Sequence, residues 1–221
     1  MDKLAKKWKI LAWALVALAG GLLITWLALT YEPEFYHRAL EQLAQQRGSP
    51  SNGLEAKGLQ LRNDIANAPQ WEALFWDGEI NSWLSEHGSS FLPAGPALRV
   101  SEPCVVFEPG HVLAACRCQR GPARVVVWLA ARIEAPTPDE VIVNIEKARI
   151  GILPIPPESI LSAMTGRTSI IGGHTVLEKR GGDCVVHVRT GGWFAKEKGH
   201  IDRIEVLEGH IRLLGRSHRA S

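Results

Sequence analysis

The side chains best suited to metal or redox chemistry are those of the four cysteines, Cys104, Cys116, Cys118 and Cys184. Cys116 and Cys118 form a C-x-C pair, and on a β-strand this spacing places both on one face, about 7 Å apart. A disulfide between them would require the backbone to move, and structural zinc sites use C-x₂₋₄-C spacing instead. The pattern leaves three interpretations: small buried side chains, disulfides in an oxidising exterior, or a metal site. We expect the first and assign neither a metal nor a cofactor.

Candidate acid–base and nucleophilic residues do not form a recognisable active site. The eight histidines are scattered through the chain without an H-E-x-x-H pattern. The sequence also contains no G-x-S-x-G elbow, Walker loop or G-x-G-x-x-G fingerprint. Asp77, Glu79 and Glu86 could act as a general acid and base, but capping and solvation of one short helix explain them more simply. The sequence therefore predicts a protein that is not an enzyme.

A cluster of tryptophans is more informative. Trp71, Trp76 and Trp83 lie within 13 residues, in the segment QWEALFWDGEINSWL, and bring more apolar surface than one short helix needs for docking. One interpretation is a helix that fills the concave side of a curved sheet as its core. The other is that this helix and one face of the strand at 125–133 line a groove for an apolar ligand. The candidate lining residues of that groove are Trp83, Phe107, Val127, Leu129 and Leu153.

The charge balance excludes nucleic acid as a partner. The chain has 221 residues and a formal net charge of +2. Residues 1–9 alone hold four lysines and one aspartate, which leaves −1 for the remaining 212 residues. A near-neutral body has no basic field with which to neutralise phosphates.

Residues 10–30 form an uncharged, largely apolar run of 21 residues, long enough as a helix to cross a ~30 Å hydrocarbon core. Lysines precede this run, so we expect a single-pass protein of the cell (inner) membrane. Its N-terminus is expected in the cytoplasm and its body outside the cytoplasm. A signal peptide cleaved after Ala17-Leu18-Ala19 is the competing interpretation, and we favour an uncleaved signal anchor. The residues expected at the membrane interfaces are Lys6, Lys7, Trp8, Lys9, Trp26 and Tyr31.

Three helices are expected before the first clear strand. Pro33 can open one whose apolar residues recur at helical spacing. After a polar linker at 48–53, a second helix is expected at about 54–66, and a third follows Asp77 as its N-cap.

From residue 98 the apolar period changes from 3.6 to 2, which is typical of strands. A turn at 108–111 would place Phe107 opposite Val112, and a turn at 208–209 would place Val206 opposite Ile211. A strand at 141–150 changes its apolar face part way, which predicts a bulge near Glu146. Prolines then open a short helix that reaches about residue 165. The other strands are expected at 124–133, 174–179 and 183–189, and the last hairpin at 201–214.

Strands joined by short turns predict an antiparallel sheet. The expected fold is α+β, with an N-terminal transmembrane helix, short helices and a curved, half-barrel-like antiparallel sheet packed on a helix. We divide the chain into a basic tail (1–9), the anchor (10–30), a helical juxtamembrane region and linker (31–70), an extracytoplasmic α+β domain (71–215) and a C-terminal tail (216–221).

Four segments carry a resemblance to a known group of proteins. The segments Ile80–Leu84, Val105–Gly110, Ile150–Pro156 and Ile204–Ile211, in this order behind a single span, resemble membrane-anchored, largely uncharacterised bacterial proteins of the YpmS kind. The resemblance covers about residues 71–215. The expected helix in a curved sheet is more distantly similar to the half-barrels of the TULIP lipid-binding superfamily. Cys116, Cys118 and the polar stretch at 189–199 depart from the pattern.

These likenesses imply an extracytoplasmic domain that holds an acyl chain or a whole lipid, and they bring no catalytic residues. The first hypothesis for the function is therefore binding of membrane lipid or another apolar ligand close to the bilayer. The alternative is an envelope scaffold that recruits protein partners through its span and an edge of its sheet.

Overall fold

The computed structural model describes residues 2–45, 52–88, 98–138, 140–159, 175–180, 183–189 and 199–217. The expected linker at 48–53 and the helix expected to reach residue 165 fall largely outside these ranges. The helices are α1 (Asp2–Thr30), α2 (Glu34–Gln45), α3 (Asn52–Asn67) and α4 (Asp77–His87). The strands are β1 (Gln70–Trp76), β2 (Arg99–Glu108), β3 (His111–Arg120), β4 (Ala123–Thr137), β5 (Glu140–Ile150), β6 (Leu153–Pro154), β7 (Thr175–Arg180), β8 (Asp183–Arg189), β9 (Gly199–Leu207) and β10 (His210–Ser217).

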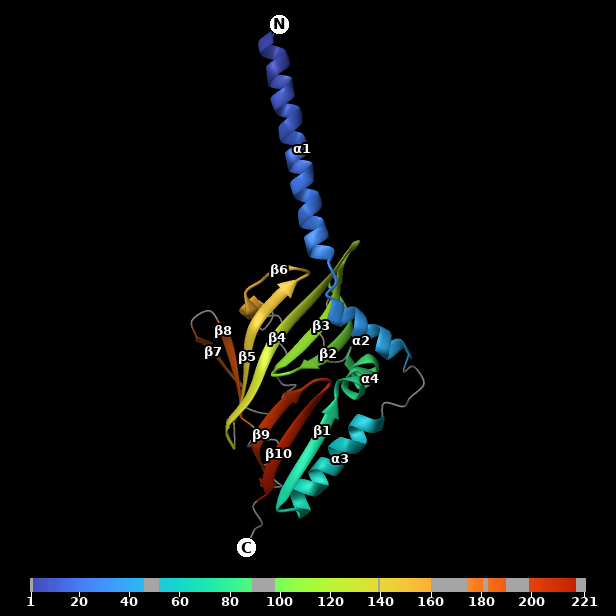
Figure 1. The fold of residues 1–221 in the computed structure, drawn as a ribbon, viewed down its shortest axis with the longest axis vertical. Helices are drawn as coiled ribbons and strands as arrows, with labels where there is room; N and C mark the ends of the chain where they lie inside the picture. Colours follow the sequence, from blue (N-terminus) through green and yellow to red (C-terminus); the bar gives the residue numbers. More distant parts are fainter. Residues whose placement is uncertain are drawn as a thin grey trace.

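Helix α1 projects away from the rest of the molecule (Figure 1). Its segment Ala12–Thr30 has a mean hydropathy of 2.1, and only 6% of its most apolar window is buried. A helix this apolar is unstable in water unless another apolar phase covers it. Length and composition therefore suit α1 to a membrane anchor, and a signal sequence has the same properties.

The strands form two antiparallel sheets. The larger has the order β2-β3-β4-β5-β8-β7, with the short β6 paired to β5, and the smaller has the order β1-β10-β9. Both are open, and helices α2, α3 and α4 lie along one side of the molecule (Figure 1). The structure thus has the α+β class and the antiparallel sheet that the sequence predicts.

Local features of the sheets follow the sequence pattern closely. Phe107 pairs with Val112 across the β2–β3 turn, and Val206 pairs with Ile211 across the β9–β10 turn. The pairing of β4 with β5 shifts register at Glu146. Ala130 pairs with Lys147, whereas Ala131 pairs with Ile145, so Glu146 is passed over. These three predictions are confirmed.

The prediction that three helices precede the first strand is wrong, because a strand lies between the second and third of them. Trp71 and Trp76 belong to this strand, β1, which precedes α4 and pairs with β10. Trp71 lies opposite Gly215, where an added Cβ would overlap its indole ring, so the ring occupies space that the glycine leaves free. The helix begins only at Asp77, and its N-cap is Trp76 rather than Asp77. Pairing with the distant strand β10 makes this segment a strand, and the local sequence pattern alone does not indicate it.

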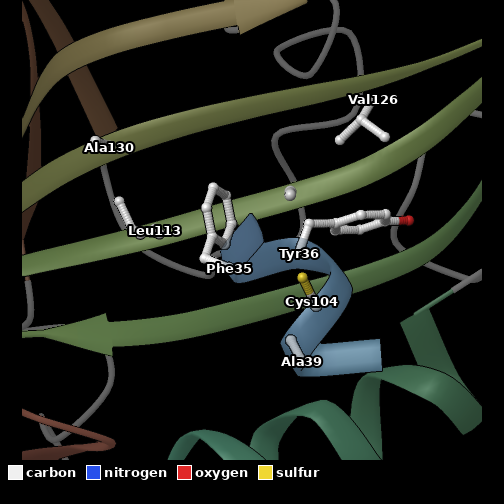
Figure 2. Packing of buried hydrophobic residues seen from close by; sticks show 8 residues of the cluster. Phe35, Tyr36, Ala39, Cys104, Leu113, Val126 and Ala130 are labelled. Atoms are coloured by element: carbon white, nitrogen blue, oxygen red, sulfur yellow. The ribbon is translucent and has the colours of Figure 1, made fainter. Parts of the chain in front are cut away.

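The helix that packs on the larger sheet is α2. Phe35, Tyr36 and Ala39 enter a buried cluster with residues of β2, β3 and β4 (Figure 2). The Phe35 ring meets Trp128 edge to face, with centroids 5.7 Å apart, a favoured aromatic geometry. The remaining buried members of this cluster are Cys104, Leu113, Ala115, Val126 and Ala130.

The smaller sheet is covered by α3. Ile65 of α3 is fully buried against Trp71 of β1 and Ile201 of β9. Ala135 of β4 and Val141 of β5 pack on the same cluster, so it joins the two sheets.

Candidate functional site

The C-terminal end of α1 is attached to the larger sheet by a backbone hydrogen bond. The amide of Ile152 donates to the carbonyl oxygen of Ala28 at 3.1 Å, within the last turn of α1. Next to it, the amide of Gly151 donates to the Val126 oxygen at 2.8 Å, and the Trp128 indole N–H donates to the Gly151 oxygen at 2.8 Å. The anchor and the sheet therefore meet at a defined contact.

Gly151 makes this contact possible. Its φ is +58°, a conformation that L side chains rarely adopt. A Cβ at this position would overlap the carbonyl oxygen of Ala28 and come within 2.8 Å of that of Leu29. Only glycine allows the two backbones to lie this close.

One face of the sheet carries half-buried apolar side chains that begin beside this junction. Val127 of β4 pairs with Ile150 of β5, which pairs with Leu153 of β6, so all three point to the same side. Leu129 continues this face two residues further along β4. We call this side of the larger sheet the apolar face, and these four residues begin it.

The apolar face extends across β5 to β8. Ala131, Ile145 and Cys184 are buried there, and Leu129, Val143 and Val186 pack against them. All six belong to strands, whereas the cluster on the opposite face includes α2. Phe107 joins the same face through its pairing with Val112 and is only 3% exposed. Four of the five candidate lining residues, Phe107, Val127, Leu129 and Leu153, thus share one face.

Trp83 is the exception, because it lies on α4 outside this sheet. Its ring stacks on His87, with centroids 5.2 Å apart. Helix α4 runs along the outer edge of β2, where the Asn81 amide accepts a hydrogen bond from the Val105 N–H at 2.7 Å. The same amide donates to the Val105 carbonyl oxygen at 2.8 Å. Asn81 thus satisfies both outward backbone groups of Val105, as a neighbouring strand would.

Two acidic residues of α4, Asp77 and Glu79, hold structural contacts. Asp77 accepts hydrogen bonds from the backbone N–H groups of Gly78 and Phe107, and burial raises its pKa above the ordinary value. Glu79 accepts from the Trp76 N–H at 3.2 Å and pairs with Lys57 at 2.7 Å. Each carboxylate is therefore occupied by its own partners. A small pocket of about 200 Å³ between α3 and β1 has Lys57 in its wall and lies away from the apolar face.

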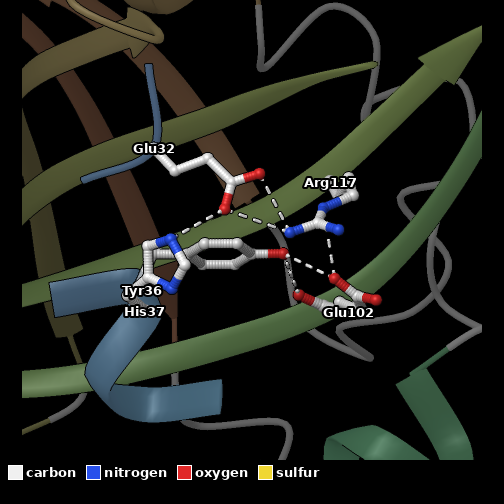
Figure 3. Close-up of polar contacts among 5 residues, drawn as sticks. All are labelled: Glu32, Tyr36, His37, Glu102 and Arg117. Atoms are coloured by element: carbon white, nitrogen blue, oxygen red, sulfur yellow. Dashed lines mark hydrogen bonds and ion pairs between the residues drawn. The ribbon is translucent and has the colours of Figure 1, made fainter. Parts of the chain in front are cut away.

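A second group of residues, which sequence reasoning missed, fixes the chain directly after α1. Arg117 of β3 donates from Nη2 to the Glu32 carboxylate at 3.0 and 3.2 Å (Figure 3). Its Nε lies 3.2 Å from Glu102 Oε2, a close ion pair without hydrogen-bond geometry. Tyr36 donates its hydroxyl hydrogen toward Glu102, and His37 lies 3.3 Å from Glu32. We call these five residues the Arg117 cluster.

The Arg117 cluster lies at an irregular point of β2. Glu102 has a φ of +51° and falls in the register shift between Ser101 and Cys104. Burial, followed by the nearby Glu102 charge, raises the pKa of Tyr36 far above its ordinary value, so this hydroxyl stays protonated as a donor. Glu32 and Arg117 are 85 residues apart, and only the fold shows that they pair.

We expect Arg117→Met to destabilise the fold by about 2 kcal/mol, because it leaves the half-buried Glu32 carboxylate, and Glu102 beside it, without their cation. Thermal unfolding of the full chain in detergent micelles, followed by tryptophan fluorescence, measures this change. Arg203→Met is the control, since Arg203 is 71% exposed and pairs with Glu205 at the surface, where loss of a pair costs less than about 1 kcal/mol. Equal effects of the two substitutions would contradict a structural role for the Arg117 cluster.

The four cysteines are free thiols in the structure. Cys104 points into the α2 cluster and is 2% exposed. Cys116 and Cys118 are half-buried on β3, paired with Val127 and Val125, so they belong to the apolar face. Burial raises the pKa of Cys104 to about 12. A hydrogen bond between Cys116 and Cys118 lowers the pKa of Cys118 and raises that of Cys116.

These pKa changes predict very different thiol reactivities, because only the thiolate is nucleophilic. In the native protein at pH 8, we expect iodoacetamide to modify Cys118 at least about 100-fold faster than Cys104. Peptide mass spectrometry after timed alkylation measures both rates. In strong denaturant the two rates should converge, and similar rates in the native protein would contradict the burial of Cys104.

The residues expected at the membrane interfaces all lie on or next to α1. Trp8, Trp26 and Tyr31 are 70%, 52% and 50% exposed. Lys6, Lys7 and Lys9 belong to the first turns of the helix. This arrangement places basic residues at one end of the apolar segment and the sheet at the other.

The part of the chain that the structure describes contains no group of three or more histidine, cysteine or acidic side chains arranged to hold a metal ion. No family model matches this sequence, and searches of curated proteins and of solved structures found no match.

Proposed function

We propose that this chain is a single-pass protein of the cell (inner) membrane whose extracytoplasmic sheet binds an acyl chain of a membrane lipid, or another apolar ligand. The observation that carries the proposal is the junction between Ala28 and Gly151-Ile152. It joins the end of the apolar helix to the same strands that carry the apolar face. The lysines before the span keep the N-terminus in the cytoplasm. The role is non-enzymatic.

The apolar face starts at the level where α1 leaves the bilayer. Val126 bonds to Gly151 at the junction, and Val127 is the next residue of β4. Leu153 follows the junction directly on the other side. At about 3.3 Å per residue, a lipid tail that leaves the bilayer beside α1 reaches Val127 and Leu153 within a few ångströms.

The energetics suit exchange with the bilayer rather than capture from water. Removing an acyl chain from water gains about 0.8 kcal/mol per CH₂. A chain that moves from the bilayer to the apolar face exchanges one apolar environment for another, so this gain largely cancels. Packing against the face then decides the affinity, and a lipid can enter and leave without a dedicated polar site.

The experiment uses the full chain in phosphatidylcholine nanodiscs that contain a small fraction of a phospholipid with a diazirine in its acyl chain. After irradiation, peptide mass spectrometry maps the cross-links. We expect cross-links on α1 and on the segment 123–154. Val127→Trp combined with Leu129→Trp fills the face and should reduce the cross-links on the strands at least about threefold, with those on α1 unchanged.

Ile142→Trp is the matched control, because Ile142 lies on the opposite face of β5 and is also half-buried. It should leave the pattern unchanged. Cross-links confined to α1 in a chain that resists alkaline extraction would overturn lipid binding by the sheet and leave the anchor intact. Loss of the chain on alkaline extraction would overturn the anchor.

The scaffold alternative needs a free sheet edge. At β2 the outward groups of Val105 bond to Asn81, and the Phe107 oxygen accepts from the Gly209 N–H at 2.9 Å. These contacts occupy the middle and the end of the β2 edge, so a partner strand would have to pair at another edge, such as β7. Stable protein partners recovered with the full chain, and lost when α1 is replaced by another span, would instead support the scaffold.

A further inference from the structure

The turn between β3 and β4 carries arginines that the proposed function does not use. Residues 117–124 read RCQRGPAR, with three arginines and no acidic residue. Arg117 is held by Glu32 and Glu102. Arg120 and Arg124 are exposed, and neither forms an ion pair with the part of the chain that the structure describes.

This turn reaches toward the membrane beside α1. Along the long axis of the molecule it rises to the level of the last turn of the helix (Figure 1). The position of β4 explains why the turn lies there. Val126 lies at the junction with Ala28. Strand β4 begins three residues before Val126, up to about 10 Å further along the strand. Helix α1 runs the opposite way, toward the sheet, and ends two residues after Ala28, about 3 Å further on. The turn therefore extends at least as far as the end of the apolar segment.

The turn itself is short and tight. Arg120 pairs with Ala123, which leaves Gly121 and Pro122 as a two-residue connection. Gly121 has a φ of +58°, and glycine followed by a residue with negative φ is typical of tight hairpin turns. The two arginines are thus held at the tip of a hairpin rather than on a loose loop.

The chemistry at this tip matches a phosphate layer. Guanidinium groups donate paired hydrogen bonds to phosphate oxygens, and basic residues next to a membrane attract anionic lipids. Glu32 and Glu102, the acids of the neighbouring cluster, are already occupied by Arg117. We propose that Arg120 and Arg124 bind the phosphate groups of anionic phospholipids in the leaflet where α1 ends, and so hold the sheet in one orientation on the bilayer. This proposal rests on the anchoring role of α1.

The test compares lipids retained by the full chain after reconstitution in nanodiscs of phosphatidylcholine and phosphatidylglycerol at 7:3. Native mass spectrometry gives the ratio of the two lipids bound to each variant. We expect Arg120→Gln combined with Arg124→Gln to lower the enrichment of phosphatidylglycerol at least about threefold. Arg120→Lys combined with Arg124→Lys should retain more of the enrichment, because the charge remains.

Arg203→Gln combined with Arg216→Gln is the control, since it removes the same charge from exposed positions on β9 and β10, far from α1 (Figure 1). It should leave the enrichment unchanged. Equal enrichment in all variants, or an equal loss in both double glutamine variants, would overturn the proposal. Alkaline extraction of the same samples and the acyl-chain cross-links on 123–154 report separately on the anchor and on lipid binding by the apolar face.

Discussion

Asn81→Asp is expected to destabilise the protein by about 3–5 kcal/mol, more than any surface substitution. Asn81 is 5% exposed, and its amide exchanges two short hydrogen bonds with the backbone of Val105. Aspartate has nearly the same shape and still accepts from the Val105 N–H. Its second oxygen, however, would face the Val105 carbonyl oxygen without a proton between them. Thermal unfolding of the full chain in micelles measures the loss, about 2–4 °C per kcal/mol for a chain of this size.

Asn81→Leu separates the charge from the lost hydrogen bonds. Leucine fills a similar volume but leaves both backbone groups of Val105 unpaired, for an expected cost of about 2–4 kcal/mol. Asn67 is the matched control, because its amide bonds to Asn63 on the exposed side of α3. Asn67→Asp and Asn67→Leu should each stay within about 0.5 kcal/mol of the native chain. An equal response at the two positions would contradict the role of Asn81 in closing the β2 edge.

The edge contact explains why a polar residue is buried in α4. A free β2 would present unpaired N–H and C=O groups to other chains, as exposed edges do. Asn81 satisfies the pair at Val105, and the Asp77 carboxylate accepts from the next outward N–H, that of Phe107. The helix thus covers the edge with side chains of its own first two turns. The sequence indicates Asp77 as a helix cap and does not indicate a role for Asn81. Both side chains bond to backbone groups of β2, a strand that pairs with β3 rather than with a segment next to α4.

Features of the sheet that depend on neighbouring residues could be predicted from the sequence. The pairs Phe107–Val112 and Val206–Ile211 follow from alternation on both sides of a short turn, and the bulge at Glu146 follows from a break in that alternation. The partners in each case are adjacent in the chain. A one-residue error in register would have moved apolar side chains to the wrong face.

Features that depend on distant partners could not be predicted. Strand β1 pairs with β10, whose residues lie about 140 positions later, and Gly215 makes the room for Trp71. Without that partner, the apolar spacing from Trp71 to Trp83 fits a helix as well as a strand. The Arg117 cluster has the same origin, since Glu32 and Arg117 meet only after α2 packs on β3.

The candidate apolar site also has a part that could be predicted from the sequence and a part that could not. Phe107, Val127, Leu129 and Leu153 share a face because strand pairing sets the direction of side chains, and that pairing is largely local. Trp83 belongs to the candidate set because the sequence predicts that its helix lies inside the curved sheet. The structure places α2 there instead, with Phe35 and Tyr36 as its buried side chains, on the face opposite to Val127.

Gly151→Ala is expected to release α1 from the sheet while the rest of the fold persists. A side chain at this position meets the carbonyl oxygens of Ala28 and Leu29, so the helix end must move and the hydrogen bond from Ile152 is lost. Hydrogen exchange of the peptide that contains Ile152, measured by mass spectrometry on the full chain in nanodiscs, should become at least about 10-fold faster. The acyl-chain cross-links on 123–154 should fall with it, if lipid reaches the apolar face through this junction.

Gly110→Ala separates the steric contact from the cost of the backbone conformation. Gly110 has a φ of +77° and no atom within 4 Å of an added Cβ, so alanine there pays only the conformational cost, about 1 kcal/mol. It should leave both the exchange at Ile152 and the cross-links unchanged. If Gly151→Ala behaved like Gly110→Ala, the contact with Ala28 would contribute nothing to the position of the anchor. The apolar face would then have no fixed place relative to the bilayer, and the proposed route of a lipid from the membrane to Val127 and Leu153 would lose its structural basis.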